Sequence, residues 1–214
     1  MPLLQVNNLA HSFEYPLFKD VNFQLEPKES MAILGVSGCG KSTLMHICST
    51  LLKPQEGEVL LLEKNIYQQK DEARLMLRRY DIGIIFQSHY LFKGFFANEN
   101  IELASLIAQQ DIEERMLKKL GIYDLMHYRV GDLSGGQQQR ISIARILAKK
   151  PKIIFADEPT GNLDDKTAHD VMDILLEYTE QNEGALLLVT HNQQLAKSCT
   201  YARYLHLDGL KEEA

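Results

Sequence analysis

A glycine-rich segment between a buried strand and a helix constrains the fold of this chain more than any other feature. Residues Gly35–Ser42 read GVSGCGKS and fit the pattern Gly-x-x-x-x-Gly-Lys-Ser/Thr. The preceding residues, MAILG, form a continuous apolar run, which is typical of a strand buried on both faces. A helix is expected from about Lys41 to Leu52, ending before Pro54. Backbone N–H groups of such a loop and the positive end of the helix dipole bind phosphate, so the sequence predicts a nucleotide-binding loop.

Individual residues of this loop have distinct expected roles. Lys41 should reach the β- and γ-phosphates, and Ser42 should give an oxygen to Mg²⁺. A loop that only caps a helix is the alternative, but a strand and a helix both flank this one. Because Cys39 lies inside the loop, modification of its thiol is expected to block nucleotide binding. The predicted nucleotide-binding residues here are Gly35, Val36, Ser37, Gly38, Cys39, Gly40, Lys41, Ser42 and Thr43.

Two carboxylates follow a second apolar strand. The segment KIIFADE places Asp157 and Glu158 at the carboxyl end of that strand, where α/β proteins bind their ligands. Asp157 is expected to hold Mg²⁺, directly or through water. Glu158 is placed to orient or deprotonate a water that attacks the γ-phosphorus. Solvated acids at a strand end are the alternative, which is common for an isolated Asp-Glu pair but less so beside a phosphate-binding loop.

Two further strand ends carry polar side chains. His191 follows the apolar run ALLLVT, and Gln87 follows IGIIF. A single histidine in such a place is often structural, but beside a phosphate loop we expect a contact with the γ-phosphate. The Gln87 amide is placed to meet Mg²⁺ or the attacking water, and a plain bond to backbone is its alternative. The predicted catalytic residues are therefore Lys41, Gln87, Glu158 and His191.

The order of elements predicts an α/β fold. Strands and helices alternate at both ends of the chain, which favours a mostly parallel sheet. The segments LLQVNNLAHSF and LFKDVNFQLEP near the start alternate as antiparallel strands do. The middle of the chain reads as helical between about Asn98 and Lys119, and a last strand is expected around RYLHL. We expect a single domain over residues 1–214 with an inserted helical subdomain at about 88–150.

Composition narrows the range of functions. The net charge of −6 argues against a nucleic-acid binder, which usually carries a basic stripe. No apolar run reaches the ~20 residues that cross a bilayer, and no signal peptide is recognised, so work at a membrane is expected to need a partner. The three cysteines show no zinc spacing and suit a reducing cytoplasm.

The segment LSGGQ at Leu133–Gln137 opens a predicted amphipathic helix in an unusual way. Ser134 and Gln137 fit a capping box. Gly135 and Gly136 nevertheless occupy the first helical turn, where each costs roughly 1 kcal/mol relative to alanine. A cap does not require them, so the two glycines predict that another molecule comes very close to this backbone.

In this order, these segments resemble the ATP-binding subunit of ABC transporters. The resemblance covers nearly the whole chain and includes the phosphate loop, Gln87, LSGGQ, the apolar strand with its Asp-Glu pair, the loop Gly161–Asp164 and His191. It implies a P-loop core with an antiparallel β subdomain and an inserted α-helical subdomain, and ATP with Mg²⁺ as the ligands. It also identifies LSGGQ as the family signature, Glu158 as the catalytic base, Asp164 as the D-loop acid and His191 as the switch histidine.

The resemblance implies a second copy of the chain as a partner. Members of the family pair head to tail, so the LSGGQ of one copy faces the ATP held by the other. Members also stack the adenine on an aromatic residue before the phosphate loop, which makes Phe13 the first choice and Tyr15 the second; a plain core aromatic is the alternative. Two positions depart from the family pattern: Lys28 stands where glycine is usual, and Asp165 follows Asp164 where serine is usual.

The segments ADEPTGNLD and LSGGQQQR are similar to the lipoprotein-release, macrolide-export and cell-division branch of bacterial ABC proteins. The resemblance implies a separate integral-membrane subunit, with this chain attached at the cytoplasmic face of the inner membrane. Five aromatics at and after Phe86, in and beside Ser88–Asn100, suggest a groove for a helix of that subunit or, equally, the subdomain's own core.

Three other functions remain as alternatives. An ATPase acting on DNA or ribosomes is disfavoured, because only about ninety residues separate Lys41 from Ser134, with no sustained heptads, and the chain holds one cassette. A small-molecule kinase is disfavoured, because that function would not explain the LSGGQ segment. Control of a cell-wall or cell-division hydrolase through a membrane partner, without transport, fits the residues as well as lipoprotein release does.

Overall fold

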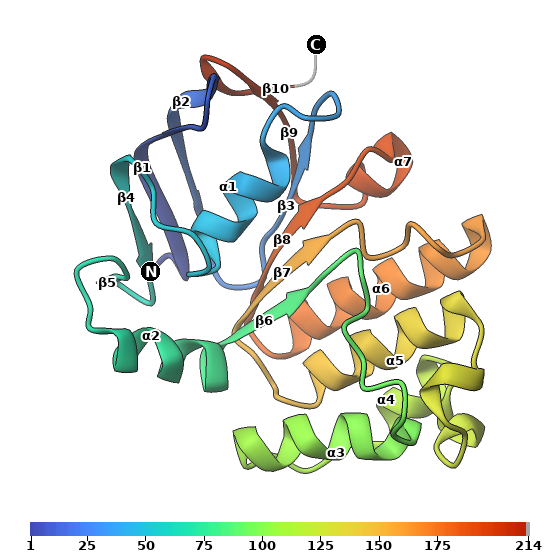
Figure 1. The fold of residues 1–214 in the computed structure, drawn as a ribbon. Coiled ribbons are helices and arrows are strands. Elements are labelled where there is room, and N and C mark those ends of the chain that lie inside the picture. Colours follow the sequence, from blue (N-terminus) through green and yellow to red (C-terminus); the bar gives the residue numbers. More distant parts are fainter. Residues whose placement is uncertain (213–214) are drawn as a thin grey trace.

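The computed structural model describes residues 1–212, which fold around two β-sheets (Figure 1). The smaller sheet is antiparallel and has the strand order β2-β1-β4-β5. Its strands are β1 (Leu4–Ser12), β2 (Pro16–Leu25), β4 (Glu56–Leu61) and β5 (Lys64–Asn65). The alternating apolar pattern of the first residues predicted the antiparallel β1–β2 pair correctly.

The larger sheet has the order β10-β9-β3-β8-β7-β6, and every neighbouring pair in it is parallel except β9 and β10. Its strands are β3 (Ser30–Leu34), β6 (Ile82–Ile85), β7 (Ile153–Asp157), β8 (Ala185–Val189), β9 (Tyr201–His206) and β10 (Gly209–Glu212). All residues of the three central strands β3, β7 and β8 are buried, as continuous apolar runs predict. The predicted α/β class with a mostly parallel sheet is confirmed.

Helices cover both faces of the parallel sheet. The helical elements are α1 (Lys41–Cys48), α2 (Asp71–Met76), the π-helix η1 (Leu77–Asp81), α3 (Ala97–Ala108), α4 (Glu114–Lys119), η2 (Tyr123–Leu125), η3 (Val130–Asp132), α5 (Gly135–Leu147), α6 (Asp165–Gln181) and α7 (Gln193–Ala196). Helix α1 lies between the two sheets, whereas α5 and α6 lie on the opposite side of the parallel sheet, with α3 and α4 beyond them (Figure 1).

Alternate side chains of the central strands face two separate apolar clusters. Ile33 and Phe155 belong to the cluster between the sheets, which includes α1. Leu34 and Ile154, one residue along, belong to the cluster formed with α3, α5 and α6. Because each fully buried Leu, Ile or Phe contributes about 1.5–3 kcal/mol, the sheet is held firmly from both faces and its strand ends are rigid supports.

The structure differs from the sequence prediction at the end of α1, in the helical stretch 98–119 and at β10, and the helical segments α2, η1 and α7 were not predicted either. Helix α1 ends at Cys48 rather than near Leu52, and Thr50 follows with a φ of 72°. The predicted helical stretch 98–119 is broken into α3 and α4 at Gln109, which has a φ of 57°. Strand β10 follows β9 and was not predicted, because Gly-Leu-Lys-Glu has neither alternation nor an apolar run.

Lys28 occupies a backbone conformation that glycine adopts more easily. Its φ is 72°, and its N–H donates to the carbonyl of Gly184. The turn before β3 therefore keeps a left-handed geometry without glycine, at a cost of about 1–2 kcal/mol. The fold thus tolerates Lys28 where the family pattern has glycine.

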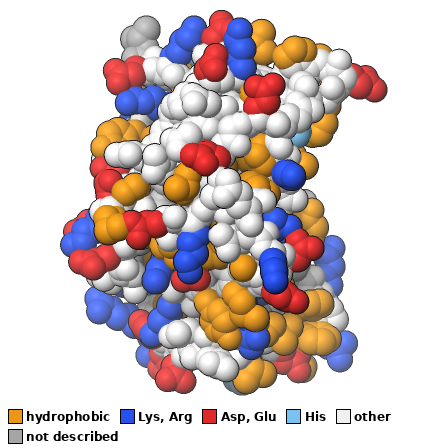
Figure 2. All heavy atoms as spheres, turned by 90° about the vertical axis from the view of Figure 1, so that its left-hand side faces the viewer, with side chains coloured by type: hydrophobic (Ala, Val, Ile, Leu, Met, Phe, Trp, Pro, Cys, Tyr) orange, Lys and Arg blue, Asp and Glu red, His pale blue; other side chains and the backbone are white. Residues whose placement is uncertain are grey.

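Figure 2 shows Lys, Arg, Asp and Glu side chains intermixed over one face of the molecule, with hydrophobic side chains gathered in its lower part. None of the helices between residues 1 and 212 combines the length and the apolar character that crossing a bilayer requires.

Candidate nucleotide-hydrolysis site

A cleft of about 480 Å³ opens at the carboxyl ends of the parallel strands. The loops after β3, β6, β7 and β8 meet there, because parallel strands end at the same edge of a sheet. The residues that line the cleft are Phe13, Tyr15, Leu17, Gly35, Ser37, Gly38, Gly40, Lys41, Ser42, Thr43, Gln87, Asp157, Glu158, Val189 and His191. Four separately predicted segments are thus brought into one site.

The glycine loop between β3 and α1 is shaped to receive phosphate. Gly40 precedes the helix with a φ of 99°, and a Cβ there would lie 3.2 Å from both Leu17 Cβ and Phe18 Cδ1. Any other residue would be strained at this position and would crowd strand β2. The Lys41 ammonium donates to the carbonyls of Gly35 at 2.8 Å and Val36 at 3.0 Å. It therefore lies along its own loop, within the cleft that a triphosphate would enter.

The residues present at the start of α1 and the end of β7 fit a magnesium ion. Ser42, Asp157 and Gln87 line the same cleft. Burial raises the pKa of Asp157, partly offset by the neighbouring Ser42 hydroxyl, so a cation beside the carboxylate would relieve its desolvation. Hydroxyl, carboxylate and amide oxygens are hard ligands of the kind that Mg²⁺ prefers.

Glu158 is held in place by two residues at the end of β8. One carboxylate oxygen lies 2.7 Å from His191 Nδ1, and the other accepts a hydrogen bond from the Thr190 hydroxyl at 3.1 Å. The Glu158 side chain is 13% exposed, whereas that of His191 is 76% exposed. The backbone at Glu158 has a φ of 45°, a conformation that costs about 1–3 kcal/mol for a non-glycine residue. The strained turn aims the carboxylate into the cleft.

Two aromatic rings form the outer wall of the cleft. Phe13 and Tyr15, in the turn between β1 and β2, are 62% and 61% exposed. Phe13 is therefore available as a stacking face and does not pack in the core, which was the alternative. Behind it lies the buried His11, whose ring centroid is 5.0 Å from that of Phe13 in an edge-to-face arrangement. Burial lowers the pKa of His11, which favours a neutral ring there.

The LSGGQ segment lies outside this cleft and begins helix α5 with the predicted capping box. Ser134 Oγ accepts from the Gln137 N–H at 3.3 Å, and Gln137 Oε1 accepts from the Ser134 N–H at 2.9 Å. A Cβ at Gly135 would meet nothing within 4 Å, so the fold of a single chain does not require this glycine. Gly136 differs, because a Cβ there would lie 3.1 Å from Leu163 Cδ2. Of these two glycines, only Gly135 is not required by packing within the single chain.

Asp164 has a structural role that sequence reasoning missed. It is the N-cap of α6, and its carboxylate accepts from Thr167 N–H at 3.0 Å and from Thr167 Oγ1 at 2.6 Å. These two hydrogen bonds hold the pKa of Asp164 below its ordinary value. The signal was present, because aspartate is one of the residues preferred at the N-cap of a helix.

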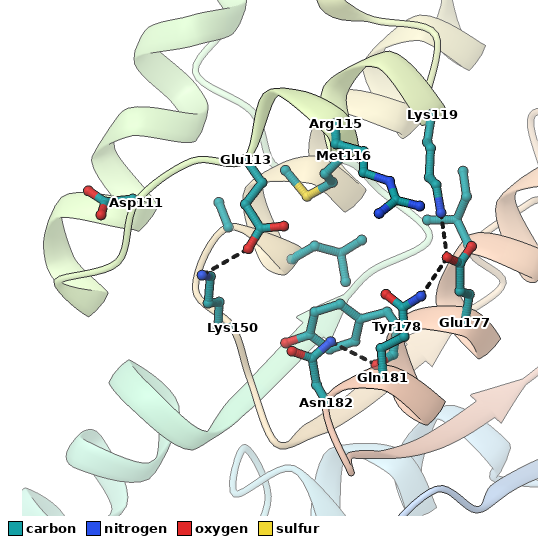
Figure 3. Close-up of a pocket in the computed structure, with 13 residues that line it drawn as sticks. Asp111, Glu113, Arg115, Met116, Lys119, Lys150, Glu177, Tyr178, Gln181 and Asn182 are labelled. Carbon is teal, nitrogen blue, oxygen red and sulfur yellow. Dashed lines mark hydrogen bonds and ion pairs between the residues drawn. The ribbon is translucent and has the colours of Figure 1, made fainter.

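A second, more enclosed cavity of about 290 Å³ lies between α4, the end of α5 and α6 (Figure 3). Two ion pairs cross its edges: Lys150 with Glu113 at 2.9 Å and Lys119 with Glu177 at 2.5 Å. They attach α4 to the body of the protein. None of the predicted site residues lines this cavity.

Not every predicted residue reaches the cleft, and some that do were not predicted. Val36 and Cys39 belong to the glycine loop without lining the cleft, and LSGGQ and Asp164 lie elsewhere. Leu17 and Val189 line the cleft, and Thr190 orients Glu158. Leu17 and Val189 resemble ordinary strand residues in the sequence, so only the folded arrangement reveals them, whereas Thr190 is a polar residue at a strand end, the signal that also marked His191.

The sheet order, the glycine loop and the acids at the end of β7 define a P-loop nucleotide hydrolase. A protein-family model described as ABC transporter matches residues 18–161. A lipoprotein-releasing system ATP-binding protein, LolD, from Shewanella oneidensis is 39% identical over 206 residues, covering 91% of this chain and 89% of that protein. Its namesake from Rickettsia bellii is 43% identical over 183 residues, covering 83% of this chain and 80% of that protein.

Solved structures agree with this match. A dimeric ATP-binding cassette in a post-hydrolysis state, bound to ADP and Pi, aligns with a TM-score of 0.89 and 31% identity, covering 99% of this chain and 97% of that one. CbiO1 of Clostridium perfringens, part of an ABC transporter complex, aligns with a TM-score of 0.83 and 27% identity, covering 98% and 87%. The chain belongs to the ABC transporter family. It is a nucleotide-binding ATPase subunit of that family.

Alkylation of Cys39 is expected to lower the affinity for ATP. The Cys39 sulfur packs against the apolar cluster around α1, and a Cβ at Gly35 would lie only 2.8 Å from it. A maleimide adduct must displace the phosphate loop, and overpacking of this kind costs about 1–3 kcal/mol, or roughly tenfold or more in affinity. Binding of a fluorescent ATP analogue before and after N-ethylmaleimide treatment measures the effect, with the labelled site found by mass spectrometry.

The other two thiols are poorly reactive by comparison. Burial raises the pKa of Cys199 to about 11 and also raises that of Cys48, so both are protonated at neutral pH. A Cys39→Ser protein should bind ATP and resist the reagent. Full ATP affinity in a protein alkylated only at Cys39 would contradict the prediction.

Proposed function

We propose that this chain hydrolyses ATP to drive an integral-membrane subunit that releases lipoproteins from a bacterial inner membrane, or performs a related force-transmitting task. The observation that carries the proposal is the cleft, which gathers the phosphate loop, Gln87, Asp157, Glu158 and His191 at one sheet edge. The relatives named for lipoprotein release support the choice of substrate class. The site of action would be the cytoplasmic face of that membrane.

Different residues of the cleft bind the base, the phosphates and the metal ion of ATP. The adenine stacks on Phe13, which is worth about 1–3 kcal/mol. The loop N–H groups and Lys41 bind the phosphates. Ser42, Asp157 and Gln87 would hold Mg²⁺, which supplies positive charge against the phosphate oxygens when bound.

Hydrolysis depends on a water held between the γ-phosphorus and Glu158. The carboxylate takes a proton as the water oxygen bonds to the γ-phosphorus and the bond from that phosphorus to the β,γ-bridging oxygen breaks, leaving ADP and phosphate. The hydrogen bonds from Thr190 and His191 keep the carboxylate oriented before the reaction begins. The exposed edge of His191 is then free to contact the γ-phosphate.

The second half of each ATP site would come from another copy of the chain. Gly135 opens α5 with free space where a side chain would be, and the helix tip offers backbone N–H groups and the Ser134 hydroxyl to an anion. In a head-to-tail pair this tip would close over the γ-phosphate bound by the partner copy. The dimeric cassette with ADP and Pi supports this arrangement.

The aromatic segment after Gln87 is proposed to contact the membrane subunit. Tyr90 is 68% exposed, and Phe92, Phe95 and Phe96 are 40–49% exposed, so a large part of each ring faces outward. The fully buried Asn100 holds the segment, because its amide donates to the carbonyls of Phe92 at 3.2 Å and Phe96 at 3.0 Å. A supported, exposed aromatic surface suits an apolar helix of a partner.

A Tyr90→Asp substitution is expected to weaken attachment to the membrane subunit while the soluble protein still hydrolyses ATP. A charged side chain at the centre of an apolar contact removes an anchor worth about 2 kcal/mol or more. Co-purification of the tagged chain with its native membrane subunit measures the loss. Tyr123→Asp, which places the same charge on an exposed tyrosine of η2, is the control. Equal recovery of the membrane subunit with Tyr90→Asp and wild type would exclude this surface.

The substrate class is tested on the same complex. The chain and its native membrane subunit are reconstituted in liposomes that contain a lipidated protein, and ATP-dependent release of that protein is measured. Release supports the proposal. Stimulation of a cell-wall hydrolase without release of any lipoprotein would replace it with the regulatory alternative.

A further inference from the structure

Helix α5, which begins with LSGGQ, packs closely against the edge strand β6. Gly83 in the strand faces Ile146 of the helix, and a Cβ on Gly83 would lie 2.4 Å from Ile146 Cγ2. Only glycine permits the helix to come this near. The two positively charged residues Arg145 and Lys149 lie four residues apart on α5 and just beyond its end, so they share one face beside this contact.

Arg145 contacts the chain just after β6. Its guanidinium donates to the carbonyl of Tyr90 at 2.8 Å and to the carbonyl of His89 at 3.2 Å. The Ser142 hydroxyl, one turn earlier, also donates to the His89 carbonyl at 3.2 Å. These carbonyls belong to the segment that links Gln87 to the exposed aromatic rings.

Lys149 contacts the chain just before β6. Its ammonium donates to the carbonyl of Arg78 at 2.6 Å, in the π-helix η1, and to the carbonyl of Ile82 at 2.9 Å, at the first residue of the strand. Lys149 therefore holds the start of β6 and Arg145 holds the segment that follows the strand, with the close Gly83–Ile146 contact between these two attachments.

Stability alone does not explain these two cations. Within residues 1–212, no carboxylate forms an ion pair with either side chain. Burial lowers the pKa of Arg145, and burial together with Arg145 lowers the pKa of Lys149 to about 8. A half-buried cation without an acid is unfavourable compared with an apolar side chain of similar size. What the pair does provide is a directional attachment to four carbonyls.

We propose that Arg145 and Lys149 are positioning residues that clamp β6 to α5, so that Gln87 and the aromatic segment move together with the LSGGQ helix tip. The inference rests on the proposed function, because it assigns the clamp to communication between the membrane-facing segment and the second ATP site. A force on the aromatic rings then displaces the helix tip directly. Ordering of the tip by ATP, in turn, orders the segment.

Amide hydrogen exchange of the full-length protein tests the clamp. In a Glu158→Gln background with ATP and Mg²⁺, the paired copies hold the α5 tip, and exchange over residues 88–96 should slow. Adding Arg145→Met should leave the dimer intact by light scattering but make exchange over 88–96 about tenfold faster, since loss of hydrogen bonds from a charged group costs on the order of 1.4 kcal/mol of local stability. The exchange of β3 and β8 should not change.

Two further variants separate positioning from general destabilisation. Arg145→Lys keeps the charge but loses the guanidinium that donates to two carbonyls at once. With this substitution, ATP should still slow amide exchange over residues 88–96, but only in part. Lys150→Met removes a neighbouring cation that pairs with Glu113 instead (Figure 3), and it should retain all of the slowing. If both Arg145 variants form the dimer and ATP slows exchange over residues 88–96 as much as it does without them, the clamp is excluded and the proposed function is unaffected. Failure of Glu158→Gln itself to form a dimer would overturn the proposed function, and the clamp with it.

Discussion

A Glu158→Gln protein given ATP and Mg²⁺ is expected to accumulate as a dimer and to lose about 10²–10⁴-fold in turnover, the usual contribution of a positioned general base. Glutamine keeps the length of the side chain, and its amide oxygen can still accept from the Thr190 hydroxyl. It cannot take a proton from the attacking water. ATP therefore stays between the two copies, and the closed pair does not separate.

Light scattering with ATP and Mg²⁺, together with a phosphate-release assay, measures both parts of this result. Glu72→Gln, in the exposed first turn of α2, is a matched change of a carboxylate outside the cleft and should behave as wild type. A Glu158→Gln protein that remains monomeric with ATP bound would contradict the proposed pairing. Wild-type turnover in that protein would remove Glu158 from the role of base.

A Gly135→Asp protein is expected to bind ATP as a monomer but neither to dimerise nor to hydrolyse it. A Cβ at Gly135 meets no atom within 4 Å, and aspartate is favourable at the positive end of a helix, so the single chain tolerates the change. In the pair, the new carboxylate would face the partner's γ-phosphate. Two negative charges about 4 Å apart repel by about 4 kcal/mol at a protein surface, which corresponds to roughly a thousandfold weaker association.

Gly135→Ala is the informative companion to this variant, since it adds bulk without charge. It should dimerise more weakly than wild type but more strongly than Gly135→Asp. Three measurements distinguish the variants: ATP binding by the monomer, dimerisation in a Glu158→Gln background and steady-state ATP hydrolysis. Normal turnover in Gly135→Asp would show that no anion approaches the start of α5.

The cleft could be predicted from the sequence because its residues stand at strand ends. Gln87, Asp157 and His191 each follow a short apolar run, and in a parallel sheet such positions converge whatever the strand order. The prediction did not need the topology in detail. The antiparallel first strands and the capping box at Ser134 were likewise readable, because both depend on short-range patterns.

What could not be predicted depends on contacts between distant backbone atoms. The carbonyls that accept from Arg145 and Lys149 are present at every residue, so no side-chain pattern marks them. The break in the helical stretch at Gln109 arises from a left-handed residue that need not be glycine, and Lys28 shows the same tolerance. At Gln109 and Lys28 the folded structure overrides a local backbone preference worth about 1–2 kcal/mol.

The capping role of Asp164 affects how substitutions at this position must be interpreted. Replacement by alanine would fray the first turn of α6 at a cost of about 0.5–2 kcal/mol, and the loop in front of it would shift as a secondary effect. Lost activity would then report on helix integrity as much as on any contact across the dimer. Asparagine caps nearly as well, because its amide oxygen can still accept from the Thr167 N–H, and it removes the charge, so Asp164→Asn is the substitution that separates the two contributions.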